Sequence, residues 1–174
     1  MGSGKTYTSL LCAAALPSRQ SARIKVTVIC DVSLIGHWTK EIMAFHTPPG
    51  KRFQFNIVSY SQLEKRIRLD AVNEITKRVD LVIVDECQRY RHLSSVMLPQ
   101  VNAIRSCNRV LLLSGTPIVN GAEDTVGFCY LSVGDADAPL SDAASRRCLV
   151  YSPRAYQDSE NTIRRQTTPR SLWK

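Results

Sequence analysis

The first residues of the chain have the types and the order of a phosphate-binding loop. They are Met1-Gly2-Ser3-Gly4-Lys5-Thr6, and Gly-x-Gly-Lys-Thr is the second half of a Walker A loop. Glycines let backbone N–H groups turn inward around phosphates, and the N-terminus of a following helix adds the positive end of its dipole. In such a loop the lysine reaches the β- and γ-phosphates and the threonine hydroxyl binds Mg²⁺. We therefore predict that residues 1–6 bind ATP and that Thr6 binds Mg²⁺, the alternative being a flexible Gly/Ser leader.

A second set of residues with catalytic potential lies further along the chain. Four apolar residues are followed by two acidic residues in Leu81-Val82-Ile83-Val84-Asp85-Glu86. At the carboxyl end of a buried strand, Asp85 can hold Mg²⁺ through water, and Glu86 can orient and deprotonate an attacking water. The alternative is a core strand that runs into an acidic surface turn. The Gly-Lys-Thr string upstream argues against that alternative, so we predict a Walker B strand with Lys5, Asp85 and Glu86 as the catalytic residues.

A third string places small hydroxyl residues after an apolar run. It is Leu111-Leu112-Leu113-Ser114-Gly115-Thr116-Pro117-Ile118-Val119-Asn120. Hydroxyls at a strand end beside a nucleotide can bond to the Walker B turn and transmit the state of the nucleotide. A strand followed by a Gly-Pro turn is the alternative, and the order of the three strings argues against it. We predict a coupling role for Gln88, Ser114, Gly115 and Thr116.

The elements that position these residues follow an alternating pattern. Short apolar, β-rich runs alternate with helical patterns, which is typical of a parallel α/β sheet covered by helices on both faces. The expected strands are residues 24–30, 53–60, 81–85 and 110–114. The expected helices are residues 5–16, 34–45, 62–77, 93–105 and 121–131.

Two of the expected helices carry start signals, and the end of the chain carries none. Ser61 with Glu64, and Asn120 with Glu123, have the spacing of a capping pair. From Gly134 onward the pattern gives way to polar, Pro- and Arg-containing sequence, where we expect loops or a linker. The prediction is a domain at residues 1–133, incomplete before its phosphate-binding loop, and a basic, loop-rich segment at residues 134–174.

Composition narrows the class of protein. The net charge is +8, which favours polyanionic partners such as nucleic acid. The six cysteines form no C-x-x-C pair, so zinc-ribbon spacing is missing. We interpret them as reduced, mostly buried residues of an intracellular protein. Neither a secretory signal nor an apolar run long enough for a membrane span is visible in the sequence.

Taken together, the strings resemble a known family. Gly-Ser-Gly-Lys-Thr, Asp-Glu-Cys-Gln and Ser-Gly-Thr-Pro-Ile-Val-Asn are similar to motifs I, II and III of superfamily-two helicases. The last string is especially similar to that of Swi/Snf-type translocases. Residues 28–42 resemble the Swi/Snf stretch in which a strand leads to Ser-Leu-x-x-x-Trp-x-x-Glu-Ile, and residues 57–63 resemble a later strand of the same family. The resemblance extends over about residues 1–133.

The resemblance implies a fold, cofactors and partners. It implies the first RecA-like lobe of a P-loop NTPase that binds ATP and Mg²⁺ and hydrolyses ATP to move along nucleic acid, with DNA favoured over RNA. A second RecA-like lobe would supply an arginine, and a nuclear location or another site of DNA metabolism would follow. The turns after Cys30 and around Ser59-Tyr60 would face the nucleic-acid backbone. We interpret Trp38 as a core aromatic that anchors its helix.

The chain departs from the family pattern at one position of the acidic box. Gln88 stands where a His or Asp usually completes the box, although an amide can still bridge to Ser114 or Thr116. Two other functions therefore stay open. One is a non-catalytic nucleic-acid-binding remnant of a split or truncated helicase, and the other is a different P-loop phosphotransferase. Such kinases usually lack the acidic box followed by Ser-Gly-Thr-Pro.

Overall fold

The computed structural model describes residues 4–17, 23–50, 52–69, 75, 79–92, 94–107, 109–116, 127–128 and 131, and the backbone of residues 147–151. Several predictions lie outside these residues. They concern Met1, Gly2 and Ser3 of the phosphate-binding loop, residues 117–120 of the third string, the Asn120–Glu123 capping pair and most of the C-terminal segment.

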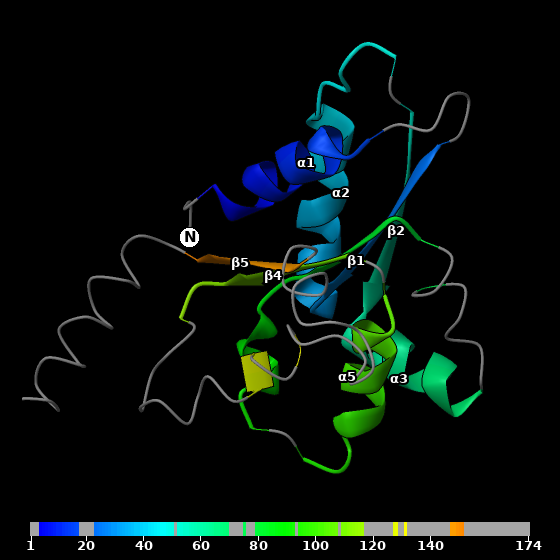
Figure 1. The fold of residues 1–174 in the computed structure, drawn as a ribbon, viewed down its shortest axis with the longest axis vertical. Helices are drawn as coiled ribbons and strands as arrows, with labels where there is room; N and C mark the ends of the chain where they lie inside the picture. Colours follow the sequence, from blue (N-terminus) through cyan, green and yellow to red (C-terminus); the bar gives the residue numbers. More distant parts are fainter. Residues whose placement is uncertain are drawn as a thin grey trace, which may run out of the picture.

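A parallel sheet forms the centre of the described structure (Figure 1). Its strands lie in the order β2-β1-β3-β4-β5, and every neighbouring pair is parallel. The strands are β1 (Ile24–Cys30), β2 (Phe53–Ser59), β3 (Leu81–Val84), β4 (Val110–Ser114) and β5 (Arg147–Tyr151). The predicted α/β fold with a mostly parallel sheet is confirmed.

Helices cover both faces of this sheet, as Figure 1 shows. One face packs against α1 (Lys5–Ala15) and α2 (Ile35–Ala44), which follows a 3₁₀ turn at Val32–Leu34. The other packs against α3 (Tyr60–Arg68) and α5 (Leu98–Arg105).

The position of β3 between the two cores explains why its sequence is apolar throughout. Leu81 and Ile83 belong to the core on the α1 side, whereas Val82 and Val84 belong to the core on the α3 side. All four residues are buried. Because successive side chains of a strand point to opposite faces, a strand covered on both sides needs an apolar residue at every position.

The start of α3 differs from the prediction. Ser59 caps the helix, since its Oγ accepts from the N–H of Gln62 while the Gln62 side chain accepts from the N–H of Ser59. The predicted capping pair of Ser61 and Glu64 is therefore wrong, and Glu64 pairs with Arg68 instead. The capping residue must keep extended backbone angles, and Ser59 satisfies this as the last residue of β2.

Helix α5 begins later than residue 93. It starts at Leu98 with a proline in its first turn, a position where the missing N–H of proline costs nothing. Before it, Cys87–Tyr90 forms a 3₁₀ turn directly after the acidic pair. The described residues between β3 and α5 thus form turns, and the predicted helix is shorter at its start.

Strand β5 is a further correction. Loops were expected from Gly134 onward, but Arg147–Tyr151 pairs with β4 along its length, from Val110 opposite Arg147 to Ser114 opposite Tyr151. The expectation of loops is wrong for these residues. Pairing with β5 gives partners to backbone groups that an edge strand would leave open. The boundary at residue 133 stays a prediction.

Two smaller findings complete the fold. Cys30, Cys87 and Cys107 are buried free thiols and Cys12 is half-buried, in agreement with the interpretation of these cysteines as core residues. Among the described helices, none has both the length and the apolar character needed to cross a membrane.

Candidate functional site

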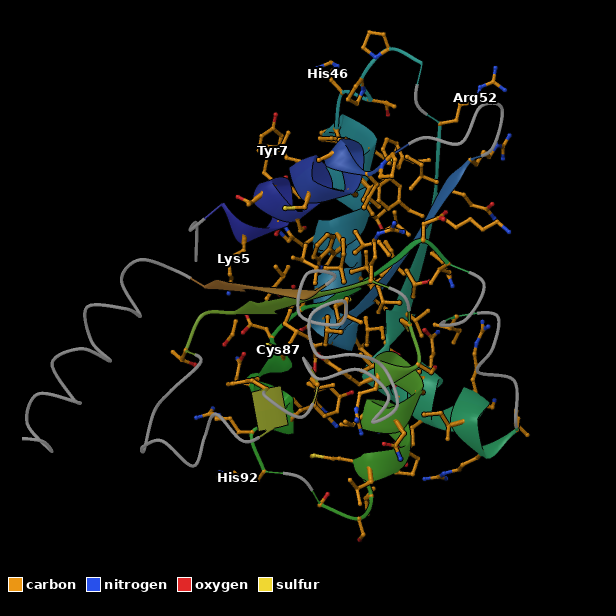
Figure 2. All side chains as sticks on the ribbon, viewed as in Figure 1. Lys5, Tyr7, His46, Arg52, Cys87 and His92 are labelled. Carbon is orange, nitrogen blue, oxygen red and sulfur yellow. The ribbon has the colours of Figure 1, made fainter. Side chains whose placement is uncertain are left out.

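The site lies where α1 begins, beside the carboxyl ends of β3 and β4. Gly4 precedes α1 with φ 70° and ψ 7°, a left-handed conformation that glycine adopts without strain. Lys5 is the first residue of the helix, and Figure 2 shows its side chain extending from α1 toward the strands. The described half of the predicted phosphate-binding loop is therefore a left-handed glycine at a helix N-terminus, which is a geometry suited to anions.

Lys5 contacts the residues that follow both strands. Its Nζ lies 3.4 Å from Oε1 of Glu86, which comes after β3. A Cβ added to Gly115, which comes after β4, would lie 3.2 Å from the same Nζ. The side chain of Lys5 is 16% exposed and that of Glu86 is 40% exposed, so the pair is partly shielded from water. The fold thus brings the first, second and third predicted strings together around one ammonium group.

Glu86 has an unusual backbone. Its φ of 52° and ψ of 47° place it in the left-handed region, where it is the one non-glycine residue among those described. Such a conformation costs free energy in a residue with a side chain and is frequent at functional sites. Here it ends β3 abruptly and turns the carboxylate toward Lys5.

Gln88 bridges the acidic pair to the third string. Its Nε2 donates to Oε2 of Glu86 at 2.5 Å, and its Oε1 accepts from the Ser114 hydroxyl at 2.8 Å. The Ser114 oxygen in turn accepts from the N–H of Thr116 at 3.2 Å. The hydrogen bonds therefore run from Glu86 through Gln88 and Ser114 to Thr116. Of the two bridges considered for Gln88, the structure contains the one to Ser114.

Asp85 is the more enclosed carboxylate of the acidic pair. Only 7% of the residue is exposed, and burial, as the largest effect, raises the pKa of its carboxyl group. The hydrogen bond from Trp38 lowers the pKa, the charge of Glu86 raises it and the charge of Lys5 lowers it. The net rise means that the protein disfavours the carboxylate charge, so a cation bound at Asp85 would relieve the cost of burial.

Trp38 and Tyr60 hold Asp85, and sequence reasoning missed both contacts. The indole Nε1 of Trp38 donates to Oδ2 of Asp85 at 2.9 Å, and the Tyr60 hydroxyl donates to the main-chain oxygen of Asp85 at 2.5 Å. Trp38 is a buried core aromatic as interpreted, but it also has this polar contact. No local pattern signals either bond, because 47 and 25 residues separate the partners in sequence.

The turn at Ser59-Tyr60, which the resemblance places toward nucleic acid, has buried side chains. Ser59 is 1% exposed and Tyr60 is 5% exposed. The Ser59 hydroxyl caps α3 and the Tyr60 hydroxyl bonds to Asp85, so neither faces a nucleic-acid backbone. The guanidinium of Arg89 instead lies 4.9 Å above the Tyr60 ring and covers it.

The oxygen donors of the site fit Mg²⁺. Thr6 and Asp85 offer a hydroxyl and a carboxylate, which are hard ligands of the kind Mg²⁺ prefers. Thr6 Oγ1 lies 3.5 Å from Nε2 of His37, and the next residue, Trp38, bonds to Asp85, so both oxygens border the start of α2. The described residues contain no cluster of three or more metal-binding side chains.

Cys87 lies beside the acidic pair, but its thiol is unreactive. Burial and the charges of Glu86 and Asp85 raise the pKa of its thiol to about 12. The thiol is therefore neutral near pH 7 and is not a nucleophile. Figure 2 labels Cys87 below the strands, on the opposite side from Lys5.

The fold and these contacts define the class of protein, an α/β lobe with RecA-like architecture. Residues 49–131 match the family model of the SNF2-related domain. The matched segment contains Asp85, Glu86, Gln88 and Ser114–Thr116, whereas Lys5 and Thr6 precede it. SNF2-related proteins are DNA-dependent ATPases and translocases that use ATP with a divalent metal. No curated protein matches the chain.

Proposed function

We propose that this chain is an ATP-binding lobe of a DNA-dependent ATPase that couples hydrolysis to movement on nucleic acid. The observation that carries the proposal is the continuous set of contacts from Lys5 through Glu86, Gln88 and Ser114 to Thr116. These contacts join a phosphate-binding lysine, a catalytic acid and a strand-end turn. The match to the SNF2-related domain supports the same function.

Phosphate can replace Glu86 as the partner of Lys5. Lys5 pairs with Glu86, and phosphate oxygens would take the place of that carboxylate when nucleotide binds. The exchange keeps the ammonium paired and frees Oε1 of Glu86. Phosphate is the stronger partner because it brings several negative oxygens to a helix N-terminus.

The freed Glu86 is the proposed general base. It stays bonded through Oε2 to Gln88, which keeps the carboxylate oriented while Oε1 takes the proton of an attacking water. Asp85 and Thr6 would hold Mg²⁺, which neutralises charge on the phosphates during transfer. Gln88 bonds to both Glu86 and Ser114. A movement of Glu86 would therefore be transmitted through Gln88 and Ser114 to the turn at Gly115 and Thr116.

The partners follow from charge and from the chemistry of phosphoryl transfer. A net charge of +8 favours binding to nucleic-acid phosphates, and the family points to DNA. An arginine supplied across the site typically contributes about 10³–10⁵ in rate. We propose that a second RecA-like lobe, in the same chain or another, supplies it.

Nucleotide binding by a lysine variant tests the proposal. Lys5→Ala removes the phosphate-binding ammonium, and a fluorescent ATP analogue titrated in Mg²⁺ should bind at least about tenfold more weakly, equivalent to about 1.4 kcal/mol. Lys40→Ala is the matched control, because Lys40 is exposed on α2. Equal affinities of the parent and Lys5→Ala would remove the nucleotide site. DNA binding without any nucleotide binding would favour the non-catalytic remnant.

A further inference from the structure

Asp85 makes four hydrogen bonds, and two of them come from aromatic side chains. Its Oδ2 accepts from Trp38 and its Oδ1 accepts from the N–H of Glu86 at 2.9 Å. Its main-chain oxygen accepts from Tyr60, and its own N–H donates to the carbonyl of Ile29 in β1 at 2.8 Å. The plane of the carboxylate is therefore set by one donor on each oxygen, and its backbone is anchored separately.

Trp38 is chemically suited to orient a carboxylate without neutralising it. An indole N–H is a donor only and does not ionise, so it fixes one lone pair of Oδ2 at any pH and leaves the charge in place. The side chain is fully buried and packs in the same core cluster as Leu10 and Ala13 of α1. A bond to a carboxylate is stronger in such a shielded place than in water.

The same helix reaches the other proposed metal ligand. His37 precedes Trp38 in α2 and lies beside the Thr6 hydroxyl. Two successive residues of α2 thus contact Thr6 and Asp85, which lie far apart in the sequence. The spacing between the two oxygens depends on where α2 sits.

We propose that Trp38 is a positioning residue for Asp85 and that its indole N–H sets the affinity of the site for Mg²⁺. The inference rests on the proposed function and deepens it. Groups that orient a metal-holding side chain typically change metal affinity by about 10- to 100-fold when they are removed. The effect should fall on the metal rather than on the nucleotide, because the Trp38 N–H donates to Asp85, whereas the phosphate-binding Lys5 bonds to Glu86.

Trp38→Phe tests the inference in the full chain, because it keeps the aromatic packing and removes the N–H. A fluorescent, non-hydrolysable ATP analogue is titrated first without metal and then at increasing Mg²⁺, and anisotropy is recorded. We expect unchanged metal-free affinity and a Mg²⁺ concentration at half-effect that is about 10- to 100-fold higher than in the parent. Tyr90→Phe is the control, since the Tyr90 hydroxyl is also buried but bonds to Gln100. It should leave the Mg²⁺ dependence unaltered.

The outcomes separate this inference from the function on which it rests. An unaltered Mg²⁺ dependence in Trp38→Phe overturns the positioning role. Equal losses with and without metal also overturn it, because they indicate a packing role only. If the parent binds no nucleotide at any Mg²⁺ concentration, the proposed function fails and the inference fails with it.

A second measurement applies if Trp38→Phe does not fold. The chain has two tryptophans, so Trp173→Phe leaves a single indole N–H resonance, that of Trp38. We expect this resonance to shift when Mg²⁺ is added to the nucleotide-bound protein and to stay in place when nucleotide is added without metal. A resonance that ignores Mg²⁺ overturns the inference.

Discussion

At the scale of single residues, the site is defined by what surrounds Lys5. Its ammonium lies between the Glu86 carboxylate and the backbone at Gly115. Glycine at position 115 leaves the room that the ammonium occupies, since an added Cβ would lie 3.2 Å away and the lysine would have to move. The predicted coupling residue Gly115 therefore also has a steric reason to be glycine.

A substitution at Gly115 should disturb Lys5 without touching nucleotide directly. We expect Gly115→Ala to shift the ammonium by a few tenths of an ångström and to weaken ATP-analogue binding by clearly less than Lys5→Ala does. The matched control is Gly36→Ala, because an added Cβ there meets nothing within 4 Å. Fluorescence titration of both variants provides the measurement. Binding by Gly115→Ala equal to that of the parent, or an equal loss in Gly36→Ala, would contradict the steric explanation.

Some residues of the site were predictable from the sequence, and others were not. Lys5, Asp85, Glu86, Gln88 and Ser114 were predicted from short strings, and the structure brings them into contact. Their chemical roles stay predictions. Trp38 and Tyr60 were missed as partners of Asp85 because a hydrogen bond between distant positions leaves no local pattern. Only the fold of β1, β2 and their following helices creates these bonds.

At the scale of elements, local signals predicted the strands well. The strands at 24–30 and 110–114 have the predicted bounds, and those at 53–59 and 81–84 end one residue earlier. Buried strands are visible because their apolar runs are continuous. β5 was missed although residues 148–151 are apolar, because the sequence on both sides is polar and the pairing with β4 is a long-range contact.

One packing contact at this scale is very close. Gly127 is buried, and a Cβ added to it would lie 1.8 Å from the carbonyl oxygen of Tyr90 and 2.9 Å from that of Arg91. Phe128 and Leu131 belong to the core on the α3 side. Gly127 therefore lies directly against the end of the 3₁₀ turn that follows Asp85 and Glu86.

Gly127→Ala should destabilise the fold through that contact. Overpacking typically costs about 1–3 kcal/mol, and a clash with backbone should reach the upper end of this range. Urea unfolding of the parent, Gly127→Ala and the control Gly36→Ala provides the measurement. A free energy of unfolding equal to that of the parent would show that the segment does not pack against the turn.

At the scale of the whole molecule, we propose one lobe of a motor that moves along a charged polymer. The net charge of +8 should make binding to DNA depend on salt, with each neutralised phosphate contributing roughly −0.7 to −0.9 to the slope of log affinity against log salt. Hydrolysis should depend on a second lobe for its arginine. The central claim is that Glu86 is the general base of an ATP hydrolysis that DNA stimulates.

Phosphate release from the chain fused to a second RecA-like lobe tests this claim most directly. The measurement compares the parent, Glu86→Gln and the control Glu64→Gln, whose carboxylate pairs with Arg68 on the same helix, with and without DNA. Glu86→Gln keeps size and hydrogen bonding but removes the base, so we expect DNA-stimulated release in the parent and the control and a loss of about 10²–10⁴ in Glu86→Gln. Release that ignores DNA, or that is unchanged in Glu86→Gln, would contradict the account.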